Sequence, residues 1–396
     1  MKKVSFCIPT AVNEKHYINL LLDSMEKNFD SLEHEVIIFV DSDNQSTFKF
    51  LKNRNNKFKD IRIIENKWPI PMGYQMNTNL MFELAKHEIV SIIQSDMVVG
   101  KHYDTEILRH LKDENTIVSA TRVEPSLHPP SVEKYTQDLG LNPDEFDVEK
   151  FNNFVSNNIN FEKITHYWFA PFAMYKKKWL EIGGNDTSFR RSREDSDILL
   201  RFRLNGLNII QTWSALVYHF TCVSSRGKEW FKKENQDRVK LQENADFVEM
   251  QKYLRKWKKF EHSAEPIKTE KYVYKSSILL KNCNLNFTDN IIAVSQFFDK
   301  VYIDDDVTLN NILNIMNNRY KFANKLFDDT EEQWNEYSKY FKKYSYDNIF
   351  MSHTESNDTD NILVSVPIDK VTQEHYEDFI TNFNDIIHTQ TESNTE

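Results

Sequence analysis

Three short runs of mostly apolar residues without any charge constrain the fold of this chain most. They are residues 4–8, 36–40 and 89–93. Each run suits a strand that is buried on both faces of a sheet and is short for a buried helix. Residues 14–27 and 71–86 lie between the runs and show the spacing of apolar side chains that is typical of helices. This alternation predicts an α/β fold, a mostly parallel sheet covered by helices.

Polar side chains follow these runs at the points where the strands are expected to end. Thr10 and Asn13 follow the first run, Asp41 and Asp43 the second, and Asp96 the third. Because open parallel sheets bind ligands at the carboxyl ends of their strands, these residues are expected at one ligand-binding edge. A carboxylate such as Asp96 can hold Mg²⁺ or Mn²⁺ there against a diphosphate. A simple turn after a strand is the alternative role for such an aspartate.

A second set of polar residues comes later, in a fixed order. Gly183-Gly184 precedes Glu194-Asp195, which stands at the expected start of a helix, and His219 follows an apolar strand. The start of a helix favours an ionised carboxylate by about 0.3–1 kcal/mol, and three nearby arginines act in the same direction. A helix cap is the alternative role for Asp195. For His219 the alternative is a hydrogen-bonded histidine at a strand end.

Together with residues 7–14, this ordered series resembles glycosyltransferase family 2 over about residues 1–230. The family pattern has a Pro-Thr first loop, an acidic pair after the second strand and an Asp-x-Asp after a later strand. Gly-Gly, a Glu-Asp-x-Asp helix start and a downstream His complete it, and each part has a counterpart here. The resemblance implies a GT-A fold and a hexosyl or N-acetylhexosaminyl transferase. Such an enzyme would invert the sugar as it moves from a nucleotide-diphosphate donor, UDP-sugar first, to a hydroxyl of a glycan or other acceptor.

The resemblance also implies a role for individual residues. One carboxylate must take the proton of the attacking hydroxyl; Asp195 is predicted as this base, with Glu194 beside it holding the acceptor or the donor sugar. Asp96 is predicted to bind the metal, and His219 to be a further metal ligand or to contact the diphosphate. Contacts to the donor or its nucleotide are predicted for Pro9, Thr10, Asn13, Glu14, Asp41, Asp43, Asn77, Gln94, Ser95 and Arg226.

One position departs from the family pattern. Gln94 stands where the first acid of the Asp-x-Asp is usual. One carboxylate fewer weakens the binding of a divalent cation, so the expected Mn²⁺ or Mg²⁺ depends on Asp96 and His219. The same departure leaves open a catalytically idle nucleotide- or sugar-binding protein, although the intact Glu194-Asp195 pair counts against it. A nucleotidyltransferase is a further alternative, but residues 9–14 contain neither the glycines nor the arginine of its phosphate loop.

The chain is predicted to form two domains and a tail. Residues 1–262 form the transferase domain, and its stretch 125–165 is an insertion on the acceptor side. Residues 263–387 form a smaller α+β domain of unknown role, with strands expected at 272–280, 291–294, 301–303 and 362–366. Residues 388–396 are polar and expected to be disordered. Trp168 is expected either to stack on a sugar ring or to be a core aromatic.

Composition narrows the range of partners and locations. The net charge of −10 argues against a nucleic-acid-binding protein. The three cysteines lie far apart and form no zinc or disulfide pattern. No apolar run approaches the ~18–20 residues of a transmembrane helix, and the first residues are too short for a signal peptide, so a cytoplasmic location is expected. The expected partners are the donor, the acceptor and, through the C-terminal domain, a second copy of the chain.

Overall fold

The computed structural model of the chain describes two compact units, and most of the described residues belong to the first. The described residues are 2–10, 14–41, 46–66, 72–127, 130–187, 189, 192–221, 249–250, 252–254, 256–257, 276–295, 300–325, 350–352 and 362–367. The strands before residue 220 belong to the N-terminal unit and those after residue 275 to the C-terminal unit. The boundary predicted at residue 262 and the tail predicted at 388–396 lie outside the described residues.

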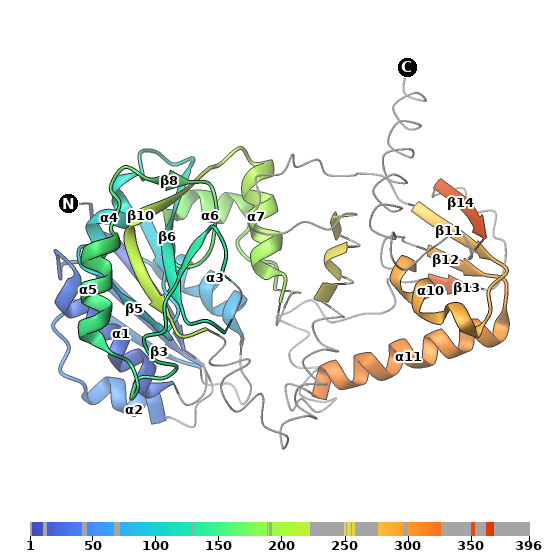
Figure 1. Ribbon diagram of the computed structural model, residues 1–396, viewed down its shortest axis with the longest axis horizontal. Helices are drawn as coiled ribbons and strands as arrows, with labels where there is room; N and C mark the ends of the chain where they lie inside the picture. The colour runs from blue at the N-terminus through green and yellow to red at the C-terminus, as the bar shows by residue number, and fades with distance from the viewer. Residues whose placement is uncertain are drawn as a thin grey trace. The chain divides into compact units, whose positions relative to one another are not determined.

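The N-terminal unit is built on one large sheet with helices on both faces (Figure 1). Its strands are β1 (Val4–Thr10), β2 (Glu35–Val40), β3 (Asp60–Glu65), β4 (Ile89–Ile92), β5 (Met97–Val99), β6 (Thr116–Glu124), β7 (Lys134–Thr136), β8 (Ile164–Thr165), β9 (Phe172–Tyr175) and β10 (Asn208–His219). Its helices are α1 (Lys15–Asn28), α2 (Ser46–Asn53), α3 (Tyr74–Leu84), α4 (Tyr103–Arg109), α5 (Val148–Asn158), α6 (Lys176–Ile182) and α7 (Glu194–Leu204). The predicted α/β class is confirmed.

The topology of this sheet brings four strand ends to one edge. The strand order is β3-β2-β1-β4-β9-β6-β10-β5, with β7 beside β6 and β8 beside β10. The first four strands are parallel. Because β9 is antiparallel to both β4 and β6, and β6 is parallel to β10, the strands β6 and β10 point the same way as β1. The carboxyl ends of β1, β4, β6 and β10 therefore lie at the same edge of the sheet.

Two strand predictions need correction. The sequence at 168–175 predicts a strand over the whole stretch, but β9 begins only at Phe172, because Pro171 has no N–H to donate to a neighbouring strand. The sequence also predicts two strands, one near residue 209 and one at 216–218. They are one strand, β10, whose pairing with β6 shifts register between Thr212 and Leu216. A bulge of this kind bends a strand without ending it.

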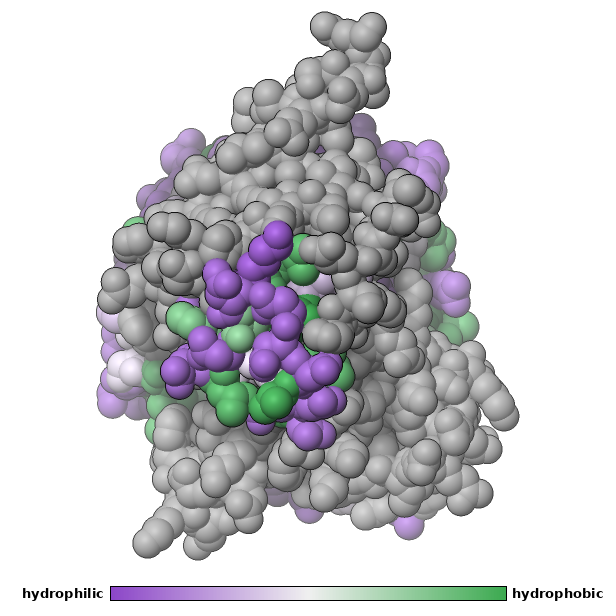
Figure 2. Space-filling view, turned by 90° about the vertical axis from the view of Figure 1, so that its right-hand side faces the viewer, coloured by the Kyte–Doolittle hydropathy of each residue, from purple (hydrophilic) through white to green (hydrophobic). Residues whose placement is uncertain are grey.

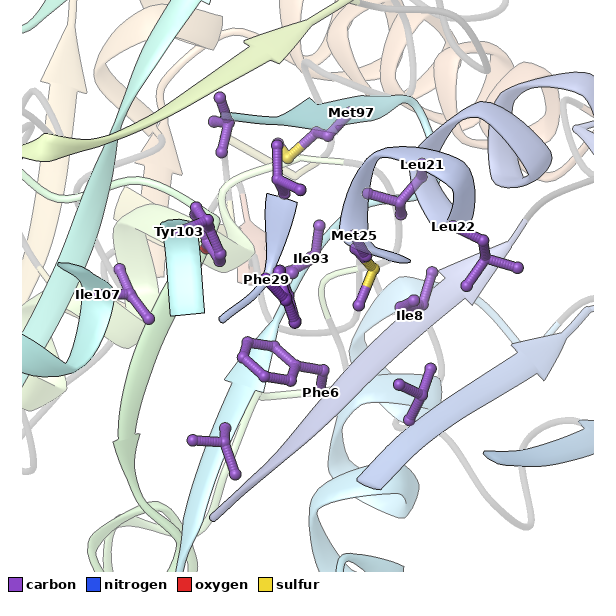
Figure 3. Packing of buried hydrophobic residues seen from close by; sticks show 14 of the residues in the cluster. Phe6, Ile8, Leu21, Leu22, Met25, Phe29, Ile93, Met97, Tyr103 and Ile107 are labelled. Atoms are coloured by element: carbon purple, nitrogen blue, oxygen red, sulfur yellow. The ribbon is translucent and has the colours of Figure 1, made fainter. Parts of the chain in front are cut away.

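Alternating side chains of β1 pack into the cores on the two faces of the sheet. Phe6 and Ile8 belong to the core closed by α1 and α4, which Figure 3 shows around Met25 and Tyr103. Cys7 belongs to the other core, to which α3, α6 and α7 contribute. Among the helices that the structure describes, none is long and apolar enough to cross a membrane.

A buried carboxylate, Glu35, stabilises the amino-terminal edge of the sheet. Its oxygens accept hydrogen bonds from the Ser5 hydroxyl at 2.5 Å, the Lys86 N–H at 2.8 Å and the Arg62 guanidinium at 3.0 Å. Burial by itself raises the pKa of Glu35, but these three donors outweigh it and hold that pKa below its usual range. The carboxylate form is therefore stabilised by folding.

Glu35→Gln is expected to lower the free energy of unfolding by about 1–3 kcal/mol at neutral pH, since charged hydrogen bonds are lost in a buried site. A group with a lowered folded-state pKa contributes its stability above its unfolded pKa, about 4.3 for Glu, and loses it as the pH falls. The difference between wild type and variant should therefore shrink below about pH 4. Urea unfolding at pH 7 and pH 3.5 measures it. The matched control is Glu33→Gln on the exposed surface nearby; an equal loss there would contradict the assignment.

The C-terminal unit contains a second, smaller sheet with the order β13-β12-β11-β14. Its described elements are β11 (Ser276–Lys281), a 3-10 turn (Leu285–Phe287), α10 (Thr288–Ser295), β12 (Lys300–Ile303), α11 (Asp306–Lys325), β13 (Phe350–Ser352) and β14 (Ile362–Pro367). All described strand pairs are parallel, which makes this part α/β where an α+β domain was predicted. The strand predicted at 291–294 is also wrong: these residues lie in α10, and four apolar residues do not distinguish the two states.

The acidic run at 304–306 has a structural role in this unit. Asp304 accepts hydrogen bonds from the N–H groups of Asn282 and Cys283 at 2.6 and 3.0 Å, and Asp305 caps α11 by accepting from the Thr308 N–H at 2.6 Å.

Figure 2 shows the face of the molecule that lies to the right in Figure 1. The described residues visible on it are mostly hydrophilic, with hydrophobic ones among them. Self-association through this unit stays a prediction.

Candidate active site

Asp96 and His219, the two residues predicted to bind a metal, lie side by side at the carboxyl edge of the N-terminal sheet. Nε2 of His219 is 3.7 Å from Oδ2 of Asp96. The Phe220 N–H donates to the Asp96 carbonyl at 3.1 Å and ties the turn after β4 to the end of β10. Both side chains are largely buried, with 13% and 10% exposed. The sheet topology thus joins two residues that are far apart in sequence.

A third residue, Glu124 at the end of β6, orients the His219 ring. Its Oε1 is 2.8 Å from Nδ1 of His219, and its Oε2 accepts from the Lys134 ammonium at 2.8 Å. Burial by itself raises the pKa of Glu124, but the His219 hydrogen bond and the charges of Arg122 and Lys134 hold it well below its usual range. Glu124 is therefore an acceptor at neutral pH, to which Nδ1–H of His219 can donate a hydrogen bond. Nε2, on the side of Asp96, is then the ring nitrogen that could hold a metal.

This pair suits a divalent cation that brings further oxygen ligands with it. A carboxylate behind a histidine is the usual outer-shell arrangement of metal-bound imidazoles. Mg²⁺ and Mn²⁺ often take only one or two protein ligands and complete their shell with water and phosphate oxygens. Within the described part of the chain, no group of three or more His, Cys, Asp and Glu side chains is placed to hold an ion. The site thus fits a metal bound together with a diphosphate better than a closed structural metal.

The end of β1 and the turn after β4 meet beside this pair. The Ser95 hydroxyl donates to the Glu14 carboxylate, and both side chains are buried. Thr10 ends β1 and is also buried. Tyr17 in α1 lies close to the same carboxylates. Burial, and after it the negative charges of Asp96 and Glu14, raise the pKa of Tyr17 to about 12. Two residues predicted to contact the donor, Glu14 and Ser95, therefore lie in one negatively charged region.

Asp41, predicted to contact the nucleotide, organises the start of α3. Its two oxygens accept four hydrogen bonds: from the N–H groups of Met72 and Gly73 at 2.9 Å each, from Nδ2 of Asn66 at 2.6 Å and from Nδ2 of Asn77 at 3.1 Å. A carboxylate has about four acceptor positions, so these donors occupy all of them. Asn77 is likewise buried and engaged with Asp41.

Glu194 and Asp195 open α7 and line a pocket together with Gln94. The other residues that line it are Tyr74, Arg122, Trp168, Ala170, Phe172, Trp179, Asn185 and Ile198. Asp195 is exposed, and its carboxylate accepts from the Ser196 N–H at 2.8 Å. Burial, and after it the charges of Glu194 and Asp195, raise the pKa of Tyr74, so its phenol keeps its proton beside the two acids.

The second aspartate of the Glu-Asp-x-Asp series, Asp197, holds α7 in place. It is fully buried, accepts a hydrogen bond from Nε of Arg201 at 2.9 Å and forms an ion pair with Nη2 of the same guanidinium at 2.7 Å. Arg201 also donates to the Gly184 carbonyl at 2.5 Å. Gly184 has a φ of +64°, a conformation that favours glycine. The Gly183-Gly184 turn and the start of α7 are therefore locked together.

Four predicted site residues add little to this geometry. Pro9 lies within β1, where it pairs with Phe39 of β2. Asn13, Asp43 and Arg226 lie outside the described residues. Their predicted contacts to the donor stay predictions.

Sequence reasoning missed Glu124, Arg122 and Asn79. Arg122 and Glu124 end β6, a strand that was not predicted, although Ile117, Val118, Ala120 and Val123 lie within it and Pro125 follows it. A strand-end carboxylate there was a signal of the same kind as Asp96. Asn79 had no such signal: it lies within α3, and its importance comes from its contacts with the distant Asn185.

One family model and several solved structures match parts of this chain. Residues 5–183 match the family model described as Glycosyl transferase family 2. Curated protein sequences show no significant match.

Several solved structures align with part of this chain. GalNAc-T7, crystallised with UDP, GalNAc and Mn²⁺, is 14% identical over 55% of this chain and 44% of its own, with a TM-score of 0.41. The mannosyltransferase PcManGT from Pyrobaculum calidifontis, in complex with GDP-Man and Mn²⁺, is 16% identical over 67% and 66%, with a TM-score of 0.43. TarS 1-349 of S. aureus is 12% identical over 84% and 91%, with a TM-score of 0.41. The chain thus spans less than half of the first of these proteins and about two thirds of the second.

Proposed function

We propose that this chain, whose residues 5–183 match the model of glycosyl transferase family 2, moves a sugar from a nucleotide-diphosphate donor to a hydroxyl group of an acceptor. One observation carries the proposal. The same edge of the sheet holds the Asp96–His219 pair and a pocket that joins Gln94 to Glu194 and Asp195. A diphosphate-binding pair and a candidate base are the two parts that such a transfer needs.

The proposed reaction inverts the sugar at C1. The acceptor oxygen forms a bond to C1 while the bond from C1 to the diphosphate oxygen breaks, and Asp195 takes the proton from the acceptor hydroxyl. Asp195 is the exposed member of the pair, so an acceptor can reach it, and Glu194 is proposed to bind a sugar hydroxyl. When bound by Asp96 and His219, Mn²⁺ or Mg²⁺ would supply positive charge that stabilises the departing nucleotide diphosphate.

The nucleotide is proposed to lie along the ends of β1 and β2. Thr10 is the last residue of β1, and beyond it Glu14 accepts a hydrogen bond from Ser95, next to Asp96. The four hydrogen bonds to Asp41 are internal, so we assign Asp41 to holding α3 and leave the contact with the base to Asp43. A carboxylate can accept from the imide N–H of uracil, which favours a UDP-sugar.

Donor hydrolysis tests the proposal. The panel consists of UDP-glucose, UDP-galactose, UDP-N-acetylglucosamine and GDP-mannose, each with Mn²⁺ and then with EDTA. We expect turnover of at least one donor, and at least about a tenfold loss when EDTA removes the charge that assists diphosphate departure. Absence of turnover for every donor, together with no thermal shift by UDP or GDP, would contradict the proposal.

A catalytically idle nucleotide-sugar-binding protein is the second candidate, and Gln94 is the observation that favours it. Loss of one acid from the metal site would lower catalysis more than binding. The two candidates differ in one measurement. The idle protein would show a thermal shift with a nucleotide sugar but no release of nucleotide diphosphate, with or without Mn²⁺.

A further inference from the structure

Three side chains of the pocket carry a buried polar atom that has no hydrogen-bond partner among the described residues. The atoms are Nε1 of Trp168, Nδ2 of Asn185 and Oε1 of Gln94. Trp168 is only 3% exposed and Asn185 only 5%. Leaving a buried polar group unpaired costs about 1–3 kcal/mol, so native proteins contain few of them. Three in one pocket with aromatic walls indicate a site for a ligand with several polar groups.

The indole of Trp168 is fixed by the chain around it. Its ring packs against Phe172 and Phe202, with ring centroids 5.1 and 5.7 Å apart. The loop that carries it is tied to β6, because Nε of Arg122 donates to the Ala170 carbonyl at 2.6 Å. The indole N–H therefore cannot turn to another partner without breaking this packing, and it is oriented before any ligand binds.

Asn185 is held by its main chain, which leaves its side-chain amide available. Oδ1 of Asn79 accepts from the Asn185 N–H at 2.8 Å, and Nδ2 of Asn79 donates to the Asn185 carbonyl at 3.0 Å. The preceding residue, Gly184, is fixed through its carbonyl by Arg201. Two helices, α3 and α7, thus clamp the turn that presents Asn185 to the pocket.

The three atoms define the chemistry of the ligand. An indole N–H and an amide NH₂ only donate, whereas an amide oxygen only accepts. A ligand that satisfies all three must offer acceptors at two positions and a donor at a third. A sugar ring does so through its hydroxyl or acetamido groups. We therefore propose that Trp168 and Asn185 are specificity-determining residues that donate hydrogen bonds to oxygen substituents of the sugar ring that is transferred; this assignment rests on the proposed function.

Burial favours the donor sugar over the acceptor as the occupant. The transferred sugar is attached to the rest of the donor only through C1, so the other sides of its ring can be enclosed. An acceptor glycan continues beyond its reacting hydroxyl and needs an open side. Trp168 and Asn185 are buried, whereas Asp195 in the same pocket is exposed. The ring of the donor therefore belongs on the buried side and the acceptor on the side of Asp195.

Calorimetry with Trp168→Phe and Asn185→Ala tests the assignment. Each variant is titrated with UDP and with UDP-N-acetylglucosamine and UDP-glucose, and with GDP and GDP-mannose. The affinity for each nucleotide sugar is divided by the affinity for its own free nucleotide, UDP or GDP. This ratio measures the contribution of the sugar. Each variant should lower that contribution about 3- to 10-fold, the value of one neutral hydrogen bond, and leave the affinity for the free nucleotide unchanged. Thermal unfolding shows that each variant is folded.

Trp213→Phe is the matched control. This tryptophan is equally buried, but its Nε1 already donates to Thr165 Oγ1 at 3.0 Å and it does not line the pocket. The substitution should lower thermal stability and leave the sugar contribution unchanged.

Three outcomes would overturn the assignment, and they can be distinguished. If wild type gains affinity from the sugar and both pocket variants keep that gain, the pocket assignment is wrong and the proposed function stands. If only the KM for the acceptor rises in the variants, the pocket holds the acceptor instead. If wild type binds none of these nucleotides or nucleotide sugars, the assignment and the proposed function fail together.

Discussion

Asp195→Asn is expected to lower the rate of sugar transfer by about 10²- to 10⁴-fold, the usual contribution of a general base. The asparagine amide cannot take the proton that the acceptor hydroxyl releases as it attacks C1. The affinity for the nucleotide sugar should change little, because the donor is proposed to bind through other residues. Steady-state transfer kinetics, with kcat and KM determined separately, measure the effect as a loss confined to kcat.

The choice of asparagine separates chemistry from helix capping. Asp195 stands at the start of α7 and accepts from the Ser196 N–H, so a structural role there was the alternative. Asparagine caps helices about as well as aspartate does. A loss of rate without a loss of thermal stability therefore identifies the base.

Two other acids of the same region serve as controls. Glu181→Gln changes an exposed carboxylate of α6 and should leave transfer unchanged. Asp197→Asn breaks the buried ion pair with Arg201 and should lower the melting temperature of the protein more than its rate per folded molecule. Transfer by Asp195→Asn at close to the wild-type rate would remove Asp195 from the role of base and leave Glu194 as the next candidate.

The parts of this fold that sequence predicted well are those set by local burial. The runs at 4–8, 36–40 and 89–93 agree with β1, β2 and β4 to within two residues at each end. Strands at the centre of a parallel sheet are covered on both faces and therefore remain apolar along their whole length. The strand predicted at 291–294 was wrong because a short apolar run is also found where a helix is buried. Sequence alone does not distinguish such a run from a buried strand.

The parts that sequence did not predict depend on contacts between distant segments. His219 meets Glu124 across 95 positions of the chain, and Asn79 meets Asn185 across 106. No local sequence pattern predicts that either pair is in contact, because the arrangement of the fold brings the two residues of each pair together. Asp41 shows the converse. Its place after a strand predicted a ligand contact, whereas its environment supplies four donors from within the protein.

Asp96→Asn and Glu124→Gln are expected to weaken Mn²⁺ binding to different degrees. Glu124 acts through His219, and loss of such an outer-shell partner weakens metal binding about 10- to 100-fold. Asp96 would itself be a ligand, so its loss should exceed that range, at about 100-fold or more. Electron paramagnetic resonance of Mn²⁺ in the presence of UDP measures the free ion and does not depend on catalysis.

A loss of Mn²⁺ affinity in Glu124→Gln that is smaller than the loss in Asp96→Asn would indicate that Glu124 orients His219 for metal binding. In Glu124→Gln the side chain keeps its size but loses the charge that fixes the Nδ1 proton of His219. The His219 ring can then adopt the tautomer that protonates Nε2, the nitrogen facing Asp96. Glu106→Gln is the matched control, because Glu106 is another buried acid with a basic partner, Arg109, but lies in α4. Wild-type Mn²⁺ affinity in Glu124→Gln, with a large loss in Asp96→Asn, would show that the metal is held without His219.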